Sequence, residues 1–139
     1  MIEFNYETDF KLNSEDKNIS WIQEIISSEG KTEGDVSFIF CNDKYLLDIN
    51  QRYLDHDTYT DIITFDYCEG DLISSDIFIS VERVEENSKI FNVSFDKEMS
   101  RVMAHGVLHL IGYNDKTDEQ SVEMKKKEEE KIKMFHVEH

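Results

Sequence analysis

One stretch of the sequence decides how the whole chain is interpreted: HGVLHLIGYND, residues 105–115. The residues around its two histidines are apolar nearly all round a helix, which predicts a buried helix. His105 and His109 are four residues apart, so both imidazoles lie on one helix face, about one turn apart. Gly112 lets the chain end the helix and turn back. Asp115, just beyond that turn, is then placed to approach the same point.

These three side chains predict a metal site. Two imidazoles at this spacing are, by themselves, more often packed or hydrogen-bonded core residues than ligands. Adjacent imidazoles in an apolar helix are costly without a partner, however, and the turn supplies a carboxylate as third ligand. We therefore expect His105, His109 and Asp115 to hold Zn²⁺ with a fourth position left for water, which is typical of a catalytic site. Two histidines and a carboxylate also suit Fe²⁺, and Ni²⁺ stays open.

Two further positions bear on the chemistry. Arg101 lies one turn before His105 on the same polar side of the helix, which indicates a guanidinium aimed at a phosphate. We expect Arg101 and the two histidines to be catalytic, the histidines through the metal that they hold and Arg101 by neutralising negative charge that develops on that phosphate. Zinc peptidases carry a general-base glutamate directly after the first histidine, and here that position is Gly106. A zinc metallopeptidase-like hydrolase is therefore an alternative, but the sequence lacks the general-base glutamate that its reaction needs.

Length and charge narrow the class of protein. A chain of 139 residues with 39% hydrophobic residues predicts a single domain over 1–139. Its 15 basic and 31 acidic residues give a net charge of −16, which disfavours DNA and anionic membranes as partners. Any RNA must be held by a local patch, a metal ion or a larger assembly. The sequence has no apolar run that could span a membrane and no secretory signal, and Cys41 and Cys68 are unpatterned, so we expect a cytoplasmic protein.

Periodicity predicts the remaining elements. The expected strands cover 2–8, 35–41, 61–66 and 76–80, and the expected helices cover 14–29, 43–54, 81–92, 97–111 and 117–135. Residues 116–133 hold six lysines and six acids, so the last helix is neutral and is expected to be a solvated surface helix. An RNA contact through Lys125–Lys127 is the less favoured alternative.

The stretch at 105–115 resembles the signature of the YbeY family of bacterial endoribonucleases, usually His-Gly-x-Leu-His-Leu-x-Gly-Tyr-Asp-His. The segments TDIITF (60–65) and DIFIS (76–80) are similar to two further segments of that family, and the resemblance covers nearly the whole chain. It implies an α+β fold, with a central mixed β-sheet of about four strands packed with helices and a zincin-like metal-binding helix. It also implies a zinc-dependent endoribonuclease specific for single-stranded RNA, acting in 16S rRNA maturation and in ribosome quality control.

The sequence departs from the family at two positions. The third ligand, usually His, is Asp115, which lowers the formal charge of the site by one unit. Leu54 follows Asn50-Gln51-Arg52-Tyr53, where the family has an arginine thought to touch the substrate. Arg52 or His56 are possible replacements, although Arg52 is better explained as a solvated helix residue. The role of Asp76 stays open: its carboxylate either orients a ligand histidine or pairs with an arginine.

Three other functions therefore remain open besides that of an endoribonuclease. They are the metallopeptidase-like hydrolase, a non-catalytic ribosome-associated factor with a structural metal, and a ferrous oxygenase. For the endoribonuclease, the expected partner is single-stranded or ribosomal RNA in the context of the ribosome or a partner protein, because so acidic a chain makes few phosphate contacts by itself.

Overall fold

A computed structural model of the chain describes residues 1–54 and 60–137. The strands are β1 (Ile2–Tyr6), β2 (Thr32–Cys41), β3 (Ile62–Asp66) and β4 (Leu72–Ser80). The helices are α1 (Glu15–Ser28), α2 (Asp43–Leu54), α3 (Val81–Ile90), α4 (Phe95–Ile111) and α5 (Asp118–Val137). The predicted α+β class is confirmed. Within the described ranges, no helix is long and apolar enough to cross a membrane.

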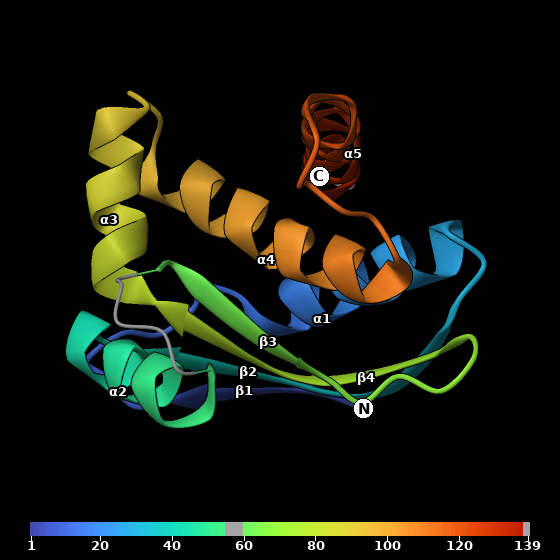
Figure 1. Cartoon of the computed structure of the whole chain (residues 1–139). Coiled ribbons are helices and arrows are strands. Elements are labelled where there is room, and N and C mark those ends of the chain that lie inside the picture. The colour runs from blue at the N-terminus through green and yellow to red at the C-terminus, as the bar shows by residue number, and fades with distance from the viewer. Residues whose placement is uncertain (55–59, 138–139) are drawn as a thin grey trace.

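The strands form one mixed sheet in the order β1-β2-β4-β3 (Figure 1). β1 pairs with β2 and β2 with β4 in parallel, whereas β3 pairs antiparallel with β4. The parallel pairs need long crossovers, and α1 supplies the first of them. The antiparallel pair needs only the turn at Gly70, whose φ of +57° suits a glycine. The expected mixed sheet of four strands is thus confirmed.

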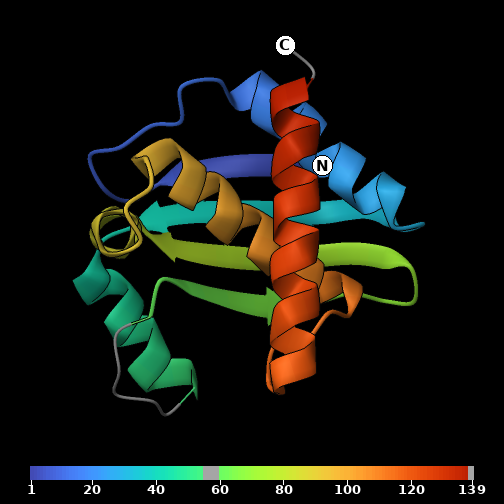
Figure 2. The same ribbon diagram turned by 90° about the horizontal axis from the view of Figure 1, so that it is seen from above.

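Helices cover the two faces of the sheet unequally. α1 and α4 pack on one face, and α5 crosses over them (Figures 1 and 2). Strand residues such as Phe38 and Ile77 point into this main core. Their neighbours point the other way, where Ile63 of β3 packs with Leu46 of α2 in a smaller cluster. The long helix α4 is therefore buried between the sheet and α5, as its apolar sequence predicts.

A glycine allows the close approach of α4 to the sheet. A Cβ atom at Gly106 would lie 2.7 Å from Cδ1 of Ile62, and 3.5 Å from atoms of Ile77 and Thr64. Position 106 therefore faces β3 and β4. The glycine that removes the base of a zinc peptidase thus has a packing reason of its own.

The prediction that α5 is a solvated surface helix is wrong for one of its faces. Met124 and Ile132 are buried there, together with Glu128 and Lys131, which are 3% and 1% exposed. A charged side chain is buried when another group matches its charge. The alternating Lys and Glu triplets conceal this pattern, because each of the two buried charges has a partner outside α5, His105 for Glu128 and Glu29 for Lys131.

Candidate metal centre

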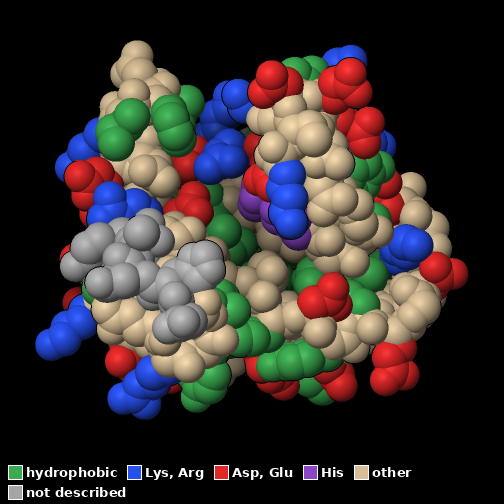
Figure 3. Space-filling model, viewed as in Figure 1, with side chains coloured by type: hydrophobic (Ala, Val, Ile, Leu, Met, Phe, Trp, Pro, Cys, Tyr) green, Lys and Arg blue, Asp and Glu red, His purple; other side chains and the backbone are tan. Residues whose placement is uncertain are grey.

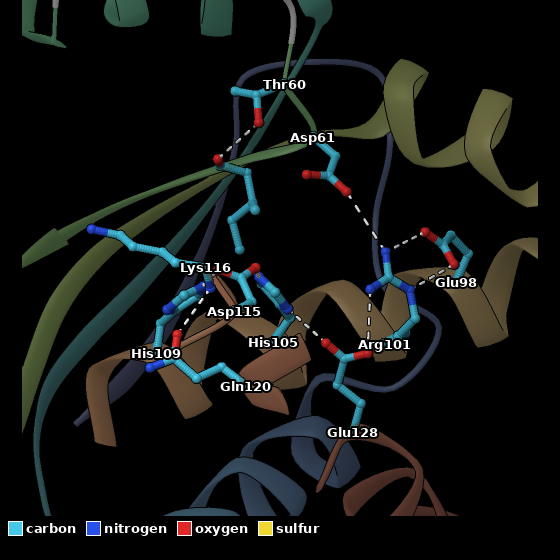
Figure 4. Close-up of polar contacts among 11 residues, drawn as sticks. Thr60, Asp61, Glu98, Arg101, His105, His109, Asp115, Lys116, Gln120 and Glu128 are labelled. Atoms are coloured by element: carbon cyan, nitrogen blue, oxygen red, sulfur yellow. Dashed lines mark hydrogen bonds and ion pairs between the residues drawn. The ribbon is translucent and has the colours of Figure 1, made fainter. Parts of the chain in front are cut away.

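The three predicted ligands come together at the end of α4. His105 and His109 lie on its last two turns, and Gly112 ends the helix with a φ of +123°. The backbone N–H groups of Gly112 and Tyr113 both donate to the carbonyl of Leu108, which closes the helix end. The chain then doubles back, and Asp115 faces both imidazoles (Figure 4).

The donor atoms converge on one point. Nε2 of His105 lies 3.5 Å from Oδ2 of Asp115, and Nε2 of His109 lies 3.6 Å from Oδ1. One donor atom from each residue falls within a set no more than 4.8 Å across. The two rings are 4.6 Å apart between centroids and nearly perpendicular, at 80°.

This geometry fits a divalent ion. Zn–N and Zn–O bonds of about 2.0–2.2 Å in a tetrahedral site put neighbouring donors roughly 3.3–3.6 Å apart. The His–Asp separations of 3.5 and 3.6 Å match that spacing. The side chains are 18%, 31% and 40% exposed for His105, His109 and Asp115, so the set opens to solvent on one side. Among the described residues, this is the single group of His, Cys, Asp and Glu with such convergence.

Sequence reasoning missed a fourth residue of this site, Glu128. Its Oε2 lies 2.6 Å from Nδ1 of His105 (Figure 4), and its side chain is 4% exposed. A carboxylate that accepts a hydrogen bond from Nδ1–H leaves Nε2 free to bind a metal and fixes the ring orientation. A signal did exist, because Glu128 lies midway between Met124 and Ile132 at helical spacing, and this spacing places it on the buried face of α5.

Asp76 has neither of the roles considered for it. It lies on the face of the sheet away from α4, since its neighbours Ser75 and Ile77 are buried on the α4 side. Its Oδ2 accepts a hydrogen bond from the hydroxyl of Tyr67 at 3.1 Å. The sequence alone could not assign it, because strand alternation permits either face until one strand neighbour is placed.

Arg101 lies beside the histidines, surrounded by acids. Its Nε and Nη2 donate to the two carboxylate oxygens of Glu98 at 3.0 and 2.8 Å, and Nη1 lies 3.4 Å from Glu128. Asp61, directly before β3, is 3.7 Å away (Figure 4). Hydrogen bonding to Glu98 raises the pKa of Arg101, and its own burial only partly opposes this. The predicted contact between Arg101 and a phosphate stays a prediction.

Burial also affects two titrating groups of the site. It raises the pKa of Asp61, and the charges of Arg101 and His105 oppose that rise. It lowers the pKa of His109, and the neighbouring His105 lowers it further, whereas Asp115 opposes the change. A neutral imidazole is the form that binds a metal, so the surroundings of His109 favour binding.

A second network supports the turn that carries Asp115. The hydroxyl of Tyr113 donates to Oε1 of Glu29, at the end of α1, over 2.6 Å. Lys127 and Lys131 of α5 contact Oε2 of the same carboxylate at 3.2 and 2.7 Å. The metal turn is therefore held by two helices that are far apart in sequence. The Lys127 ammonium, one of the three lysines considered for RNA, is engaged here instead.

Of the two candidate substrate residues near Leu54, the structure describes Arg52. Arg52 is 70% exposed and pairs with Asp48 of its own helix at 3.2 Å. This supports the interpretation of Arg52 as a solvated helix residue. His56 lies outside the described residues.

Comparison with known proteins identifies the family to which the chain is similar. Residues 3–136 match the sequence profile of a family described as Endoribonuclease YbeY. Endoribonuclease YbeY of Flavobacterium johnsoniae is 58% identical over 138 residues, which is 99% of each chain. That of Flavobacterium psychrophilum is 56% identical over 137 residues, covering 99% of this chain and 98% of the relative. The solution structure of TM1509 from Thermotoga maritima superposes with a TM-score of 0.65 and 28% identity, covering 99% of this chain and 91% of that one.

Proposed function

This chain belongs to the YbeY endoribonuclease family, and from that premise we propose that it is a zinc-dependent nuclease for single-stranded RNA in ribosomal RNA maturation. His105, His109 and Asp115 are the proposed ligands. The observation that carries the proposal is their convergence, with His–Asp donor separations of 3.5 and 3.6 Å, on the open side of a buried helix. Action on 16S rRNA and in ribosome quality control is part of the same proposal.

The proposed chemistry divides between the ion and the chain. When bound, a divalent cation supplies Lewis-acid polarisation of a phosphodiester oxygen and makes a nearby water or 2′-hydroxyl more acidic. Glu128 accepts a hydrogen bond from Nδ1–H of His105, and so keeps Nε2 pointing into the site. Arg101, held by Glu98, is the proposed source of positive charge for the phosphate as charge builds up on it.

The acidity of the chain bears on the substrate. A net charge of −16 opposes binding of free RNA through many phosphate contacts. We therefore include the ribosome or a partner protein in the proposal as the means of bringing RNA to the site. A shallow dependence of free-RNA binding on salt concentration is the expected signature of this arrangement.

The test measures metal content and RNA cleavage together. Protein purified without added metal is analysed for bound ions, and wild type is compared with His109→Ala at equal folded fraction. Asn114→Ala, in the same turn but without a donor in the metal set, is the matched control. We expect bound zinc and cleavage in wild type and the control, and loss of both in His109→Ala.

Two outcomes would overturn parts of this proposal. Equal RNA cleavage by wild type and His109→Ala would remove the metal from the reaction and leave a structural ion. Bound iron in place of zinc would instead reject zinc as the cofactor. Cleavage of casein would favour the peptidase alternative, against which position 106 already argues because it faces the sheet and not the ligands.

A further inference from the structure

A groove adjoins the metal centre between the corner that joins α3 to α4 and the side of α5. Its volume is about 470 Å³, and Arg101 and Glu128 line it. The same Glu128 contacts His105, so the groove and the metal centre share a wall. Figure 3 shows the histidines in a recess between the α3 and α5 parts of the surface, with Lys and Arg side chains along the recess.

We propose that this groove binds a nucleotide of single-stranded RNA next to the bond that is cut. The inference rests on the proposed function and assigns the neighbouring substrate subsite to residues outside the metal centre. Continuity with the metal centre is the first argument, because an RNA strand that reaches the ligands must leave the recess along one of its walls.

The walls of the groove suit a nucleobase. Phe91, directly after α3, lines it, and its side chain is 56% exposed. Val93 and Ile132 provide further apolar surface. Exposed aromatic rings stack on unpaired bases, and removal of one such ring typically weakens binding of single strands about 10-fold or more. A base stacked on Phe91 would cover apolar surface that is now open to water.

The rim of the groove suits a phosphate. Lys97 and Lys125 line it, and neither makes an ion pair within the part of the chain that the structure describes. Arg101, by contrast, is already matched by buried carboxylates. Three basic and three acidic side chains line the groove, so their charges cancel, whereas the whole chain carries −16. The groove is therefore a neutral region in an acidic protein, where two free ammonium groups can meet a phosphate.

The three lysines of the α5 triplet differ in their relation to the groove. Lys125 lines the groove and also borders the neighbouring surface of α5 that holds Lys126, which does not line the groove. Lys127 contacts Glu29 and the ring of Tyr113. An RNA contact through this triplet is thus confined to Lys125 in our proposal. Lys126 becomes a matched control of equal charge on the same helix.

The experiment compares two substrates with the zinc-loaded protein. One is a fluorescently labelled single-stranded oligoribonucleotide, whose cleavage gives KM. Binding of its 2′-O-methyl analogue gives Kd. The other is bis(p-nitrophenyl) phosphate, a small diester that can reach the metal without filling the groove. The variants are Phe91→Ala with the control Ile90→Ala, and Lys97→Ala and Lys125→Ala with the control Lys126→Ala.

We expect Phe91→Ala to raise Kd and KM for the oligoribonucleotide about 10-fold. Ile90→Ala, which removes a neighbouring side chain that is 68% exposed and lies off the groove, should change neither value. Each groove lysine variant should weaken binding and reduce the slope of log K against log salt by about 0.7. Hydrolysis of the small diester should stay at the wild-type rate in all of them.

The outcomes separate this inference from the proposed function. The proposal that the groove binds RNA would be wrong if wild type cleaves RNA and if Phe91→Ala and the groove lysine variants bind RNA as tightly as their controls. The proposed function would then still stand. If zinc-loaded wild type cleaves neither substrate, the proposed function is wrong. The Kd values of the variants would still decide whether RNA binds in the groove. Because the altered side chains are exposed or on the rim, circular dichroism and Tm should match wild type.

Discussion

The carboxylate of Glu128 on α5 lies 2.6 Å from Nδ1 of His105 on α4. The other oxygen of Glu128 lies 3.4 Å from Nη1 of Arg101. One buried acid thus links a predicted ligand to the neighbouring cation, and it brings the last helix of the chain into the site. α5 therefore supports the orientation of His105, a proposed ligand, in addition to covering α4.

Glu128→Gln should weaken metal binding. The substitution keeps the size of the side chain but removes the charge that orients His105, and such outer partners of a metal ligand are worth about 10–100-fold in affinity. Competition with a chromophoric chelator measures the Kd for Zn²⁺. Glu129→Gln, next in the sequence and exposed, is the control and should bind as wild type does. Unchanged affinity in Glu128→Gln would show that the contact with His105 has no effect on the ligand.

Asp115 should behave as a true ligand despite the departure from the family signature. Asp115→Ala removes one of three donors. It should therefore lose more Zn²⁺ affinity than the loss of roughly 10–100-fold that follows when a hydrogen-bond partner of a ligand is removed. Asp115→His restores a third imidazole and should retain binding. Both changes are at a side chain that is 40% exposed, so stability should change by no more than about 0.5 kcal/mol. Calorimetric titration of zinc decides the ranking, and equal affinity in all three proteins would place Asp115 outside the metal set.

The sequence predicts the fold and the convergence of His105, His109 and Asp115 because both depend on local pattern. The i, i+4 histidines, the glycine that ends α4 and the acid beyond it are all encoded within the one stretch 105–115. Element bounds follow from periodicity where apolar residues dominate. The starts of β2 and β4 were not predictable in this way, because β2 begins with the polar stretch Thr32–Asp35 and two serines, Ser74 and Ser75, interrupt the apolar pattern early in β4.

What the sequence does not predict are the long-range pairings of buried charges. Glu128 and His105 are 23 residues apart, and Lys131 and Glu29 are 102 apart. Among the many acidic and basic residues of this chain, no local pattern distinguishes a buried pair from a solvated one. The face of the sheet on which Asp76 lies was undetermined for the same reason, since only tertiary packing distinguishes the two faces.

Arg101 should matter for stability as well as for RNA. Arg101→Met leaves Glu98 and Glu128, whose side chains are 2% and 4% exposed, without their shared cation. Loss of one partner from buried charges typically costs about 3–5 kcal/mol, so we expect a decrease of about that size in the free energy of unfolding. Arg101→Lys should lose less, because it keeps the charge without the two-pronged contact. Urea denaturation measures both, and RNA cleavage must be compared at equal folded fraction. A fully stable but inactive Arg101→Met would assign Arg101 to the substrate alone.

Acid stability should depend on Glu29. Burial would raise the pKa of this carboxyl, but hydrogen bonds from Lys131, Tyr113 and Lys127 outweigh it and lower the pKa from 4.5 to about 2. A carboxyl with a lowered pKa stabilises the folded protein above its unfolded pKa, and this stabilisation is lost as the pH falls towards the folded value. The shift corresponds to about 3 kcal/mol, lost between about pH 4.5 and pH 2.

Glu29→Gln isolates this contribution from that of the other acids. At pH 7 the variant should be less stable than wild type by up to about 3 kcal/mol, because Lys131, only 2% exposed, loses the carboxylate at 2.7 Å and keeps that of Glu130 at 2.9 Å. The difference between the two proteins should shrink as the pH falls below 4.5, since protonation of Glu29 removes the same interaction from wild type. Denaturation curves at several pH values measure it, with Glu119→Gln as an exposed control. A difference that stays constant down to pH 2 would mean that the carboxyl does not titrate in this window, and that Glu29 acts through its hydrogen-bond geometry and not its charge.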